Sequence, residues 1–249
     1  MISVADFVKQ YDSTLAADGL TFRVEPGQIM GLIGPNGAGK TTTLKALSGV
    51  VRPTRGTISL CGLSVTNDSV ATKRVLSYIP DDPPLFPDLT VDQHLAFAGA
   101  AYAVADSDSR AQELLDEFQL CSKRKTLARD LSRGMRQKLA ICCGYLHDPS
   151  VILFDEPLTG LDPVGIRTLK ETIVRRAAAG AAIIVSSHLL AMVENLCSHV
   201  LILDSGLQRF FGPLEELKSS FVDRQQAADL ERIFFMATGD KAELQPLGA

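Results

Sequence analysis

The stretch Gly34-Pro35-Asn36-Gly37-Ala38-Gly39-Lys40-Thr41 decides the fold of this chain. Residues 29–33 before it are apolar and typical of a buried strand, and residues 44–47 after it are typical of the first turns of a helix. A strand, a glycine-rich loop, a Lys-Thr pair and a helix in this order predict a phosphate-binding loop. A plain glycine-rich turn before a helix is the alternative, and the flanking strand and helix argue against it.

The residue types in this loop fit the chemistry of a nucleoside triphosphate. Glycines let backbone N–H groups turn inward around a phosphate, and a helix N-terminus adds unpaired donors with a partial positive charge. Lys40 is long enough to reach the β- and γ-phosphates, and the hydroxyl of Thr41 can be a ligand of Mg²⁺. The residues of this loop that we expect to bind the nucleotide are Gly34, Pro35, Asn36, Gly37, Ala38, Gly39, Lys40, Thr41 and Thr42.

The composition is ordinary for a globular protein with a sizeable core. The 249 residues are 46% hydrophobic and 22% charged. A net charge of −4 argues against direct nucleic-acid binding, which needs an excess of Lys and Arg. The five cysteines form no C-x-x-C pair, which fits a reducing compartment.

Two stretches bear on targeting and on membranes. Residues 1–6 lack the basic segment and long apolar core of a signal peptide. The most apolar stretch, residues 177–193, is interrupted by Ser186-Ser187-His188 and is too short and too polar to span a bilayer. We therefore expect any membrane role to depend on a partner.

The pattern of apolar residues predicts an α/β protein with an inserted helical part. Residues 1–87 and 149–220 contain strand patterns that alternate with helices, which favours a mostly parallel sheet. Residues 88–148 between them show apolar residues at three- and four-residue steps and form a predicted helical subdomain. Residues 221–249 form a predicted short helical tail. The expected fold is a RecA-like P-loop NTPase core with an antiparallel β part at its N-terminus.

Two acids follow the apolar residues 151–154. A buried strand places Asp155 and Glu156 at its carboxyl end, where α/β proteins bind ligands. Asp155 is suited to hold Mg²⁺ through water, and Glu156 is suited to polarise an attacking water molecule. An exposed acidic pair is the alternative, and the presence of a phosphate-binding loop favours the functional interpretation.

A further motif precedes an apolar helical run. It reads Leu131-Ser132-Arg133-Gly134-Met135-Arg136-Gln137, with a Ser suited to an N-cap and a Gly that permits close backbone approach. Here the chain resembles the ATP-binding cassette family of transporter ATPases. The signature of that family, Leu-Ser-Gly-Gly-Gln, lies about twenty residues before its Asp-Glu strand, as in this chain. The resemblance covers nearly the whole chain.

The resemblance implies roles for further residues. Tyr11 stands where the family stacks adenine, Asp162 stands in the loop after the acid pair, and His188 stands at the switch histidine. Ser132 and Gly134 are expected near the γ-phosphate held by a facing copy. Taken alone, Tyr11 is better explained as a strand aromatic and His188 as an ordinary loop histidine. The expected catalytic residues are Lys40, Glu156 and His188, and the expected metal ligands are Thr41, Asp81 and Asp155.

At two places the chain departs from the family pattern, and these departures indicate a subgroup of the family. Asp81 replaces the Gln that contacts Mg²⁺ in the family, and an acid there can still be a metal ligand with a shorter reach. Arg133 and Met135 replace a Gly and a Gln of the signature. These features look like the ABC-2-type and Ecs-type exporter ATPases, and residues 230–235 resemble the short C-terminal helix of that group.

The resemblance implies an ATPase that binds ATP and Mg²⁺ and powers a separate integral-membrane subunit, for export. Two copies, or one copy and a homologous ATPase, are expected to face each other head to tail, with each ATP between Lys40 of one and Ser132 of the other. The expected location is cytoplasmic, at the inner face of the membrane through that partner. A non-transport ATPase of the same family that acts on DNA or ribosomes, and a P-loop kinase of small molecules, are the alternatives.

Two segments have both a functional and a structural interpretation. Residues 80–89 contain four prolines and the large apolar residues Leu85 and Phe86, which favours docking of a membrane protein. The alternative is that both side chains fold back onto the helical part. Residues 121–138 carry seven basic residues and one acid, which predicts either a positive field around a triphosphate or a solvated helical face.

Overall fold

The computed structural model describes residues 1–220 together with Leu230 and Phe234. Apart from these last two positions, the helical tail expected at residues 221–249 lies outside the described residues.

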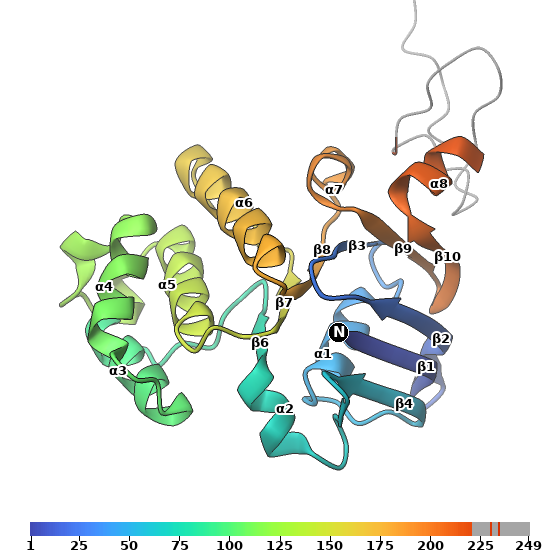
Figure 1. Cartoon of the computed structure of the whole chain (residues 1–249), viewed down its shortest axis with the longest axis horizontal. Coiled ribbons are helices and arrows are strands. Elements are labelled where there is room, and N and C mark those ends of the chain that lie inside the picture. The colour runs from blue at the N-terminus through green and yellow to red at the C-terminus, as the bar shows by residue number, and fades with distance from the viewer. Residues whose placement is uncertain (221–229, 231–233, 235–249) are drawn as a thin grey trace, which may run out of the picture.

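A curved sheet of ten strands forms the centre of the described part of the chain, in the order β5-β4-β1-β2-β10-β9-β3-β8-β7-β6 (Figure 1). The strands are β1 (Ile2–Tyr11), β2 (Thr14–Val24), β3 (Ile29–Ile33), β4 (Arg55–Leu60), β5 (Leu63–Ser64), β6 (Leu76–Ile79), β7 (Val151–Asp155), β8 (Ala182–Ser186), β9 (His199–Asp204) and β10 (Leu207–Pro213). Strands β9, β3, β8, β7 and β6 pair in parallel. Strands β1, β2, β4 and β5 pair antiparallel, and β10 joins the two parts. The predicted α/β fold, with a parallel sheet and an antiparallel N-terminal part, is confirmed.

Helices connect the strands and make a separate lobe. They are α1 (Lys40–Leu47), α2 (Ser69–Val75), α3 (Val91–Tyr102), α4 (Ser107–Glu117), α5 (Arg133–Tyr145), α6 (Pro163–Ala178), α7 (Leu190–Leu196) and α8 (Leu214–Ser220). α3, α4 and α5 pack on one another to form the lobe at the left of Figure 1, and α5 also contacts β6. α3 begins with a capping box between Thr90 and Gln93, which satisfies the free N–H groups of its first turn.

Alternation along the parallel strands divides the core between the two faces of the sheet. In β7, Ile152 and Phe154 face the cluster that holds the helical lobe, whereas Val151 and Leu153 face the cluster that holds α1 and the antiparallel part. All four side chains are fully buried, and strands apolar on both faces are typical of a parallel sheet. Tyr145 of α5 packs edge-on against Phe154, with ring centroids 6.3 Å apart, and so joins the lobe to the sheet.

The start of β2, the helix α2 and the strand β10 were not predicted from the sequence patterns. β2 begins at Thr14, and its first residues pair with β1 although Thr14 and Leu15 are exposed. The helix α2 and the strand β10 carry too few buried residues to show a clear period. Neither element supplies an expected site residue.

Candidate nucleotide-binding site

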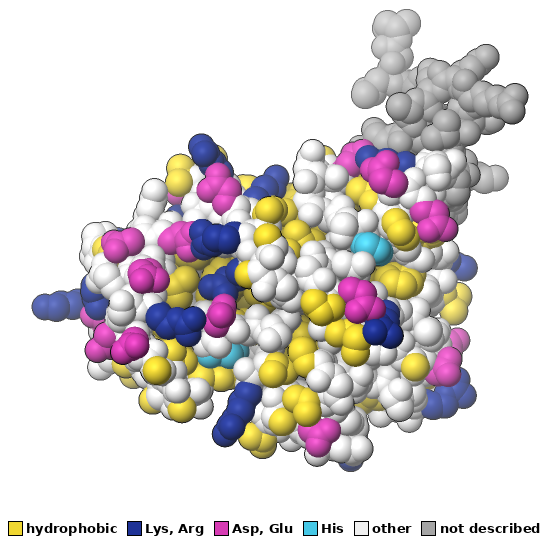
Figure 2. All heavy atoms as spheres, in the orientation of Figure 1, with side chains coloured by type: hydrophobic (Ala, Val, Ile, Leu, Met, Phe, Trp, Pro, Cys, Tyr) yellow, Lys and Arg dark blue, Asp and Glu magenta, His cyan; other side chains and the backbone are white. Residues whose placement is uncertain are grey.

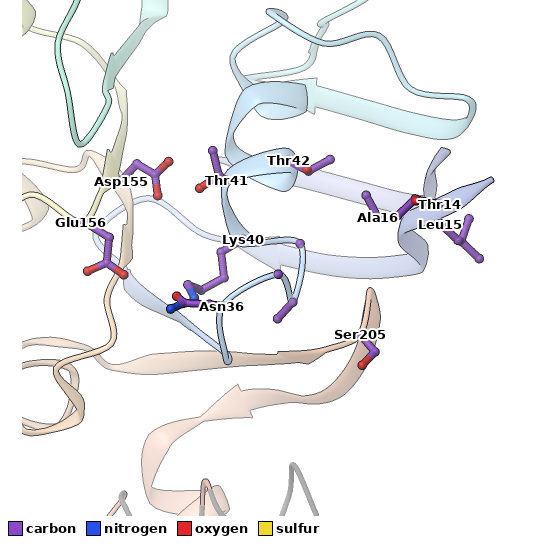
Figure 3. A pocket seen from close by; sticks show the side chains of 13 residues that line it. Thr14, Leu15, Ala16, Asn36, Lys40, Thr41, Thr42, Asp155, Glu156 and Ser205 are labelled. Atoms are coloured by element: carbon purple, nitrogen blue, oxygen red, sulfur yellow. The ribbon is translucent and has the colours of Figure 1, made fainter. Parts of the chain in front are cut away.

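The phosphate-binding loop forms one wall of a cavity of about 510 Å³. Residues 36–42 line it from the loop and from the start of α1, and Asp155 and Glu156 line it from the end of β7. The opposite side is formed by residues 14–16 at the start of β2 and by Ser205 after β9. Figure 3 shows Lys40 on the side of the loop that faces the two acids.

The ammonium of Lys40 is held inside the loop. Its Nζ donates to the carbonyl oxygens of Gly34 at 2.6 Å and Pro35 at 3.2 Å. Burial lowers the pKa of Lys40, while the charges of Glu156 and Asp155 act in the opposite direction. The residue is 8% exposed, so an anion in the cavity would offset the desolvation of this charge.

Two glycines bring the loop close to neighbouring backbone. Gly39 has φ of 103°, and a Cβ at this position would lie 2.2 Å from the carbonyl oxygen of Ala16. A Cβ at Gly34 would lie 2.3 Å from the carbonyl oxygen of Leu203. A side chain at either position would therefore push the loop away from β2 or β9 and change the shape of the phosphate cradle.

Asp155 is held in place by donors from two neighbouring strands. Its Oδ1 accepts a hydrogen bond from the hydroxyl of Ser186 at 2.7 Å, and its Oδ2 lies 3.5 Å from the hydroxyl of Tyr78. Burial and the carboxylate of Asp155 raise the pKa of Tyr78, so this hydroxyl stays protonated as a donor. Asp155 is 4% exposed, and the network fixes the direction of its carboxylate.

Glu156 has a backbone conformation that is rare for its residue type. Its φ is 49°, in the left-handed region, which costs on the order of 1 kcal/mol for a residue other than glycine. Its backbone N–H donates to Ser186 Oγ at 3.1 Å, and its Oε2 lies 2.8 Å from Nδ1 of His188. Because an ionised carboxylate only accepts, this imidazole nitrogen carries the proton. Ser186 therefore holds both acids, and His188 fixes the side chain of the second.

Several expected residues lie outside this cavity. Gly34, Pro35 and His188 line an adjoining cavity of about 520 Å³, which also contains Asn36 and Phe234. The remaining expected residues that line neither cavity are Tyr11, Asp81, Ser132, Gly134 and Asp162. The structure thus brings together the phosphate-binding loop, the acid pair and His188, and leaves the signature apart from them.

Tyr11 and Asp81 have other partners. The ring of Tyr11 is 42% exposed and lies under the ammonium of Lys9, 4.6 Å from the ring centroid. Asp81 Oδ1 pairs with Arg133 at 2.8 Å. Within residues 1–220 and the two further described positions, no group of three His, Cys, Asp or Glu is arranged to hold a metal. The metal role expected of Asp81 stays a prediction, since in this structure its carboxylate pairs with Arg133.

The signature lies at the start of α5 and contacts the loop before α6. Ser132 is exposed, and its hydroxyl accepts the N–H of Met135 at 3.3 Å as an N-cap. A Cβ at Gly134 would lie 2.4 Å from the carbonyl oxygen of Gly160. Asp162 caps α6 and pairs with Lys138 of α5 at 3.0 Å, which lowers the pKa of Asp162. These contacts place the signature and the Asp162 loop together on one surface.

Sequence analysis missed the cavity wall at residues 14–16 and the role of Ser186. The wall begins three residues after Tyr11, for which a role in adenine stacking stays a prediction. Ser186 is the last residue of β8, which pairs in parallel with β7, and the register Asp155↔Ser186 brings its hydroxyl to both acids. A serine at the carboxyl end of the neighbouring strand was the available signal.

The residues present fit a nucleoside triphosphate and a divalent cation. The exposed loop residues 35–37 and the buried ammonium of Lys40 line or adjoin a cavity that also holds two acids. Oxygen atoms of Thr41 and Asp155 are the ligand type that Mg²⁺ prefers. The donor set therefore suits a triphosphate with its metal ion.

Comparison with known proteins agrees with this chemistry. The family described as ABC transporter matches residues 17–159, more than half of the chain. The chain belongs to this family. ATP-binding proteins of the family are ATPases that work with a membrane subunit, and the comparisons give no support to the P-loop kinase alternative.

Two curated relatives are similar to this ATPase over most of their length. One is the ABC-type transporter ATP-binding protein EcsA of Bacillus subtilis, 36% identical over 231 residues, which are 92% of this chain and 94% of that protein. The other is the Nod factor export ATP-binding protein I of Cupriavidus metallidurans, 34% identical over 241 residues, which are 96% of this chain and 76% of that protein.

Solved structures agree with the fold of this ATPase. The ATP-binding subunit of an ABC transporter has a TM-score of 0.90 at 34% identity and covers 96% of this chain and 99% of its own. A dimeric ATP-binding cassette, in a post-hydrolysis state with ADP and Pi, has a TM-score of 0.78 at 21% identity, with 86% and 99% covered. In the part of the ATPase that the structure describes, no helix is both long enough and apolar enough to cross a bilayer.

Proposed function

We propose that this ATPase works as a head-to-tail pair and binds two ATP molecules between its copies, as the energy source of an exporter. One observation carries the proposal. The cavity with Lys40 and Glu156 is separate from the exposed Ser132 and from Gly134, which the family places at the triphosphate. A second copy, or a homologous ATPase, supplies the missing signature to each cavity.

Five residues of the site have a proposed role. Lys40 leaves the carbonyl oxygens of its own loop and donates to the β- and γ-phosphates of ATP. Thr41 and Asp155 would hold Mg²⁺, which would supply positive charge beside the phosphate oxygens. Glu156 accepts the proton of the attacking water, and His188 holds the Glu156 carboxylate in the orientation that this step needs.

The membrane subunit is proposed to dock in an apolar groove between the lobe and the loop after β6. The groove has a volume of about 240 Å³ and is lined by residues of that loop, of α3 and of α5. Phe86 is 52% exposed and Phe97 is 55% exposed, and their rings meet edge-on at 5.5 Å. Leu85 packs partly buried against the core, whereas Phe86 contacts Phe97 of α3 with about half of its surface exposed, so Phe86 is the residue of the two that is available for docking.

Export, and a location at the cytoplasmic face of the membrane, are proposed from the relatives. One relative is named for Nod factor export, and transport by this chain needs a partner that spans the membrane. A role on DNA or RNA is disfavoured by the net charge of −4 and by the surface of the lobe, where Lys and Arg side chains alternate with Asp and Glu (Figure 2).

Light scattering of the Glu156→Gln variant tests the proposal. Because this variant keeps the binding residues but loses the proposed base, we expect ATP with Mg²⁺ to convert it from monomer to dimer. The variant that also carries Lys40→Ala is the control and is expected to stay monomeric. A Glu156→Gln protein that binds ATP tightly and stays monomeric would contradict the head-to-tail pair.

A further inference from the structure

Two residues at which this chain departs from the family pattern, Asp81 and Arg133, are each other's partners. Nη2 of Arg133 lies 2.8 Å from Oδ1 of Asp81, although the two residues lie 52 positions apart. Both side chains are about half exposed, at 49% and 46%. An exposed pair of this kind contributes little to stability, so a stronger anion can replace the carboxylate.

The pair of Asp81 and Arg133 is the last of three ion pairs that join residues 81–92 to residues 124–133. These two segments run antiparallel. Asp92 pairs with Arg124 at 2.7 Å, and Asp88 pairs with Arg129. Between these pairs the segments share backbone hydrogen bonds, from Asp92 to Arg124 and from Arg129 to Pro87, and an antiparallel bridge. Three of the seven basic residues in residues 121–138 are thus paired with aspartates opposite, and the positive field expected there is correspondingly reduced.

Of the arginines in these three ion pairs, Arg133 is the one that lies in the signature. It stands between Ser132 and Gly134, as the first residue of α5. Its Cδ lies 3.1 Å from the position that a Cβ on Gly160 would occupy, so its side chain runs across the loop before α6 and ends at Asp81. The guanidinium therefore lies on the surface that carries the signature.

We propose that Arg133 is a phosphate-binding residue for the ATP of the facing copy, and that Asp81 is the counterion that it leaves. The inference rests on the proposed head-to-tail pair. In the free chain Asp81 neutralises Arg133; in the pair a triphosphate oxygen replaces the Asp81 carboxylate. A guanidinium can donate two parallel hydrogen bonds to phosphate, and ATP carries more negative charge than one carboxylate. Asp81 then opposes closure of the pair and has no metal ligand role.

Electrostatics give the direction of each substitution. Asp81→Asn keeps the shape of the side chain and removes the charge that competes with ATP, so it favours the pair. Arg133→Gln removes the donor and disfavours the pair. If Asp81 is instead a metal ligand, Asp81→Asn is expected to weaken nucleotide binding. If the ion pair is purely structural, both substitutions are expected to weaken dimerisation equally.

The experiment measures ATP-driven dimerisation by analytical ultracentrifugation, with every variant made in the Glu156→Gln protein. We expect Asp81→Asn to lower the dimer Kd about fivefold, since each dimer contains two such sites and an exposed pair contributes a small factor at each. Arg133→Gln is expected to raise the Kd at least about tenfold. With Arg133→Gln already present, Asp81→Asn is expected to change the Kd by less than about twofold.

Two controls separate this inference from its alternatives. Asp88→Asn removes the same charge from the same segment, away from the signature, and is expected to leave the dimer Kd within about twofold. The Mg²⁺ concentration that half-saturates binding of a fluorescent ATP analogue to monomer is expected to be the same with and without Asp81→Asn. Unchanged melting temperatures show that each variant is folded.

The outcomes that overturn the inference are distinct. A dimer Kd raised by Asp81→Asn, or lowered equally by Asp88→Asn, removes the counterion role. A raised Mg²⁺ requirement assigns Asp81 to the metal instead. If the parent Glu156→Gln protein binds ATP and forms no dimer, the head-to-tail pair fails and the inference fails with it.

Discussion

Nδ1 of His188 donates a hydrogen bond to Oε2 of Glu156 at 2.8 Å, across the carboxyl ends of two parallel strands. This hydrogen bond gives the side chain of Glu156 a fixed direction, and Ser186 fixes its backbone. The two contacts support different roles for these residues, which substitution can separate.

Glu156→Gln is expected to lower the ATP hydrolysis rate by about two to four orders of magnitude, because an amide cannot accept the proton of the attacking water. His188→Ala is expected to cause a smaller loss, since the base is retained and only its orientation is lost. Phosphate release from ATP, measured under saturating Mg²⁺ for both variants, shows which of the two substitutions lowers the hydrolysis rate more. A His188→Ala protein as inactive as Glu156→Gln would show that His188 takes part in the chemical step.

Ser186→Ala is expected to lower both stability and hydrolysis. It removes the donor to the buried carboxylate of Asp155 and the acceptor of the Glu156 backbone, which corresponds to about 2 kcal/mol of unfolding free energy. Urea denaturation measures this loss. Ser198→Ala is the control, because its hydroxyl donates to the carbonyl oxygen of Ile29 outside the site, and we expect this variant to hydrolyse ATP at the normal rate.

Lys40→Ala is expected to weaken ATP binding by about tenfold or more, since it removes a charge-assisted donor to the phosphates. Its effect on stability is expected to be small, because the ammonium that burial disfavours is also removed. Calorimetric titration with ATP checks the affinity. Lys45→Ala, an exposed lysine of the same helix, is the control, and an equal loss in this variant would remove the special role of Lys40.

Phe86→Ser combined with Phe97→Ser is expected to leave the ATPase rate and the melting temperature of the isolated chain nearly unchanged, because both rings are more than half exposed. Co-purification with the membrane subunit is expected to be lost, since exposed aromatic side chains are typical anchors of an interface. Val174→Ser, at a residue of α6 that is also 52% exposed, is the control and is expected to co-purify normally. Retained co-purification of the double variant would place the docking surface elsewhere.

Local patterns were sufficient for the core of the fold. The loop at residues 34–41 follows a strand and begins a helix as predicted, and the apolar run before Asp155 forms the buried β7. Both are determined by residues close together in the sequence. β10 and α2 lacked this information, because few of their side chains are buried and their positions depend on neighbours far along the chain.

Partners distant in sequence decided the details of the site. Asp81 was predicted as a metal ligand because it replaces a Gln of the family pattern, and the ion pair that it forms with Arg133 was not predicted. The link exists because residues 81–92 and 124–133 run antiparallel, and no pattern of a single sequence reveals which segments lie side by side. Ser186 was missed for the same reason, since its role depends on the register between β8 and β7.

Mixing two inactive variants tests the central claim most directly. Lys40→Ala removes the phosphate contact of one copy, and Ser132→Arg blocks the signature that serves the other copy. In a head-to-tail pair of the two variants, one site contains both changes and the other contains neither. We expect each variant alone to be inactive and an equimolar mixture to recover about a quarter of the normal ATPase rate, since half of the pairs are mixed and each has one intact site. A mixture as inactive as its components, with mixed pairs shown to form, would contradict the composite site.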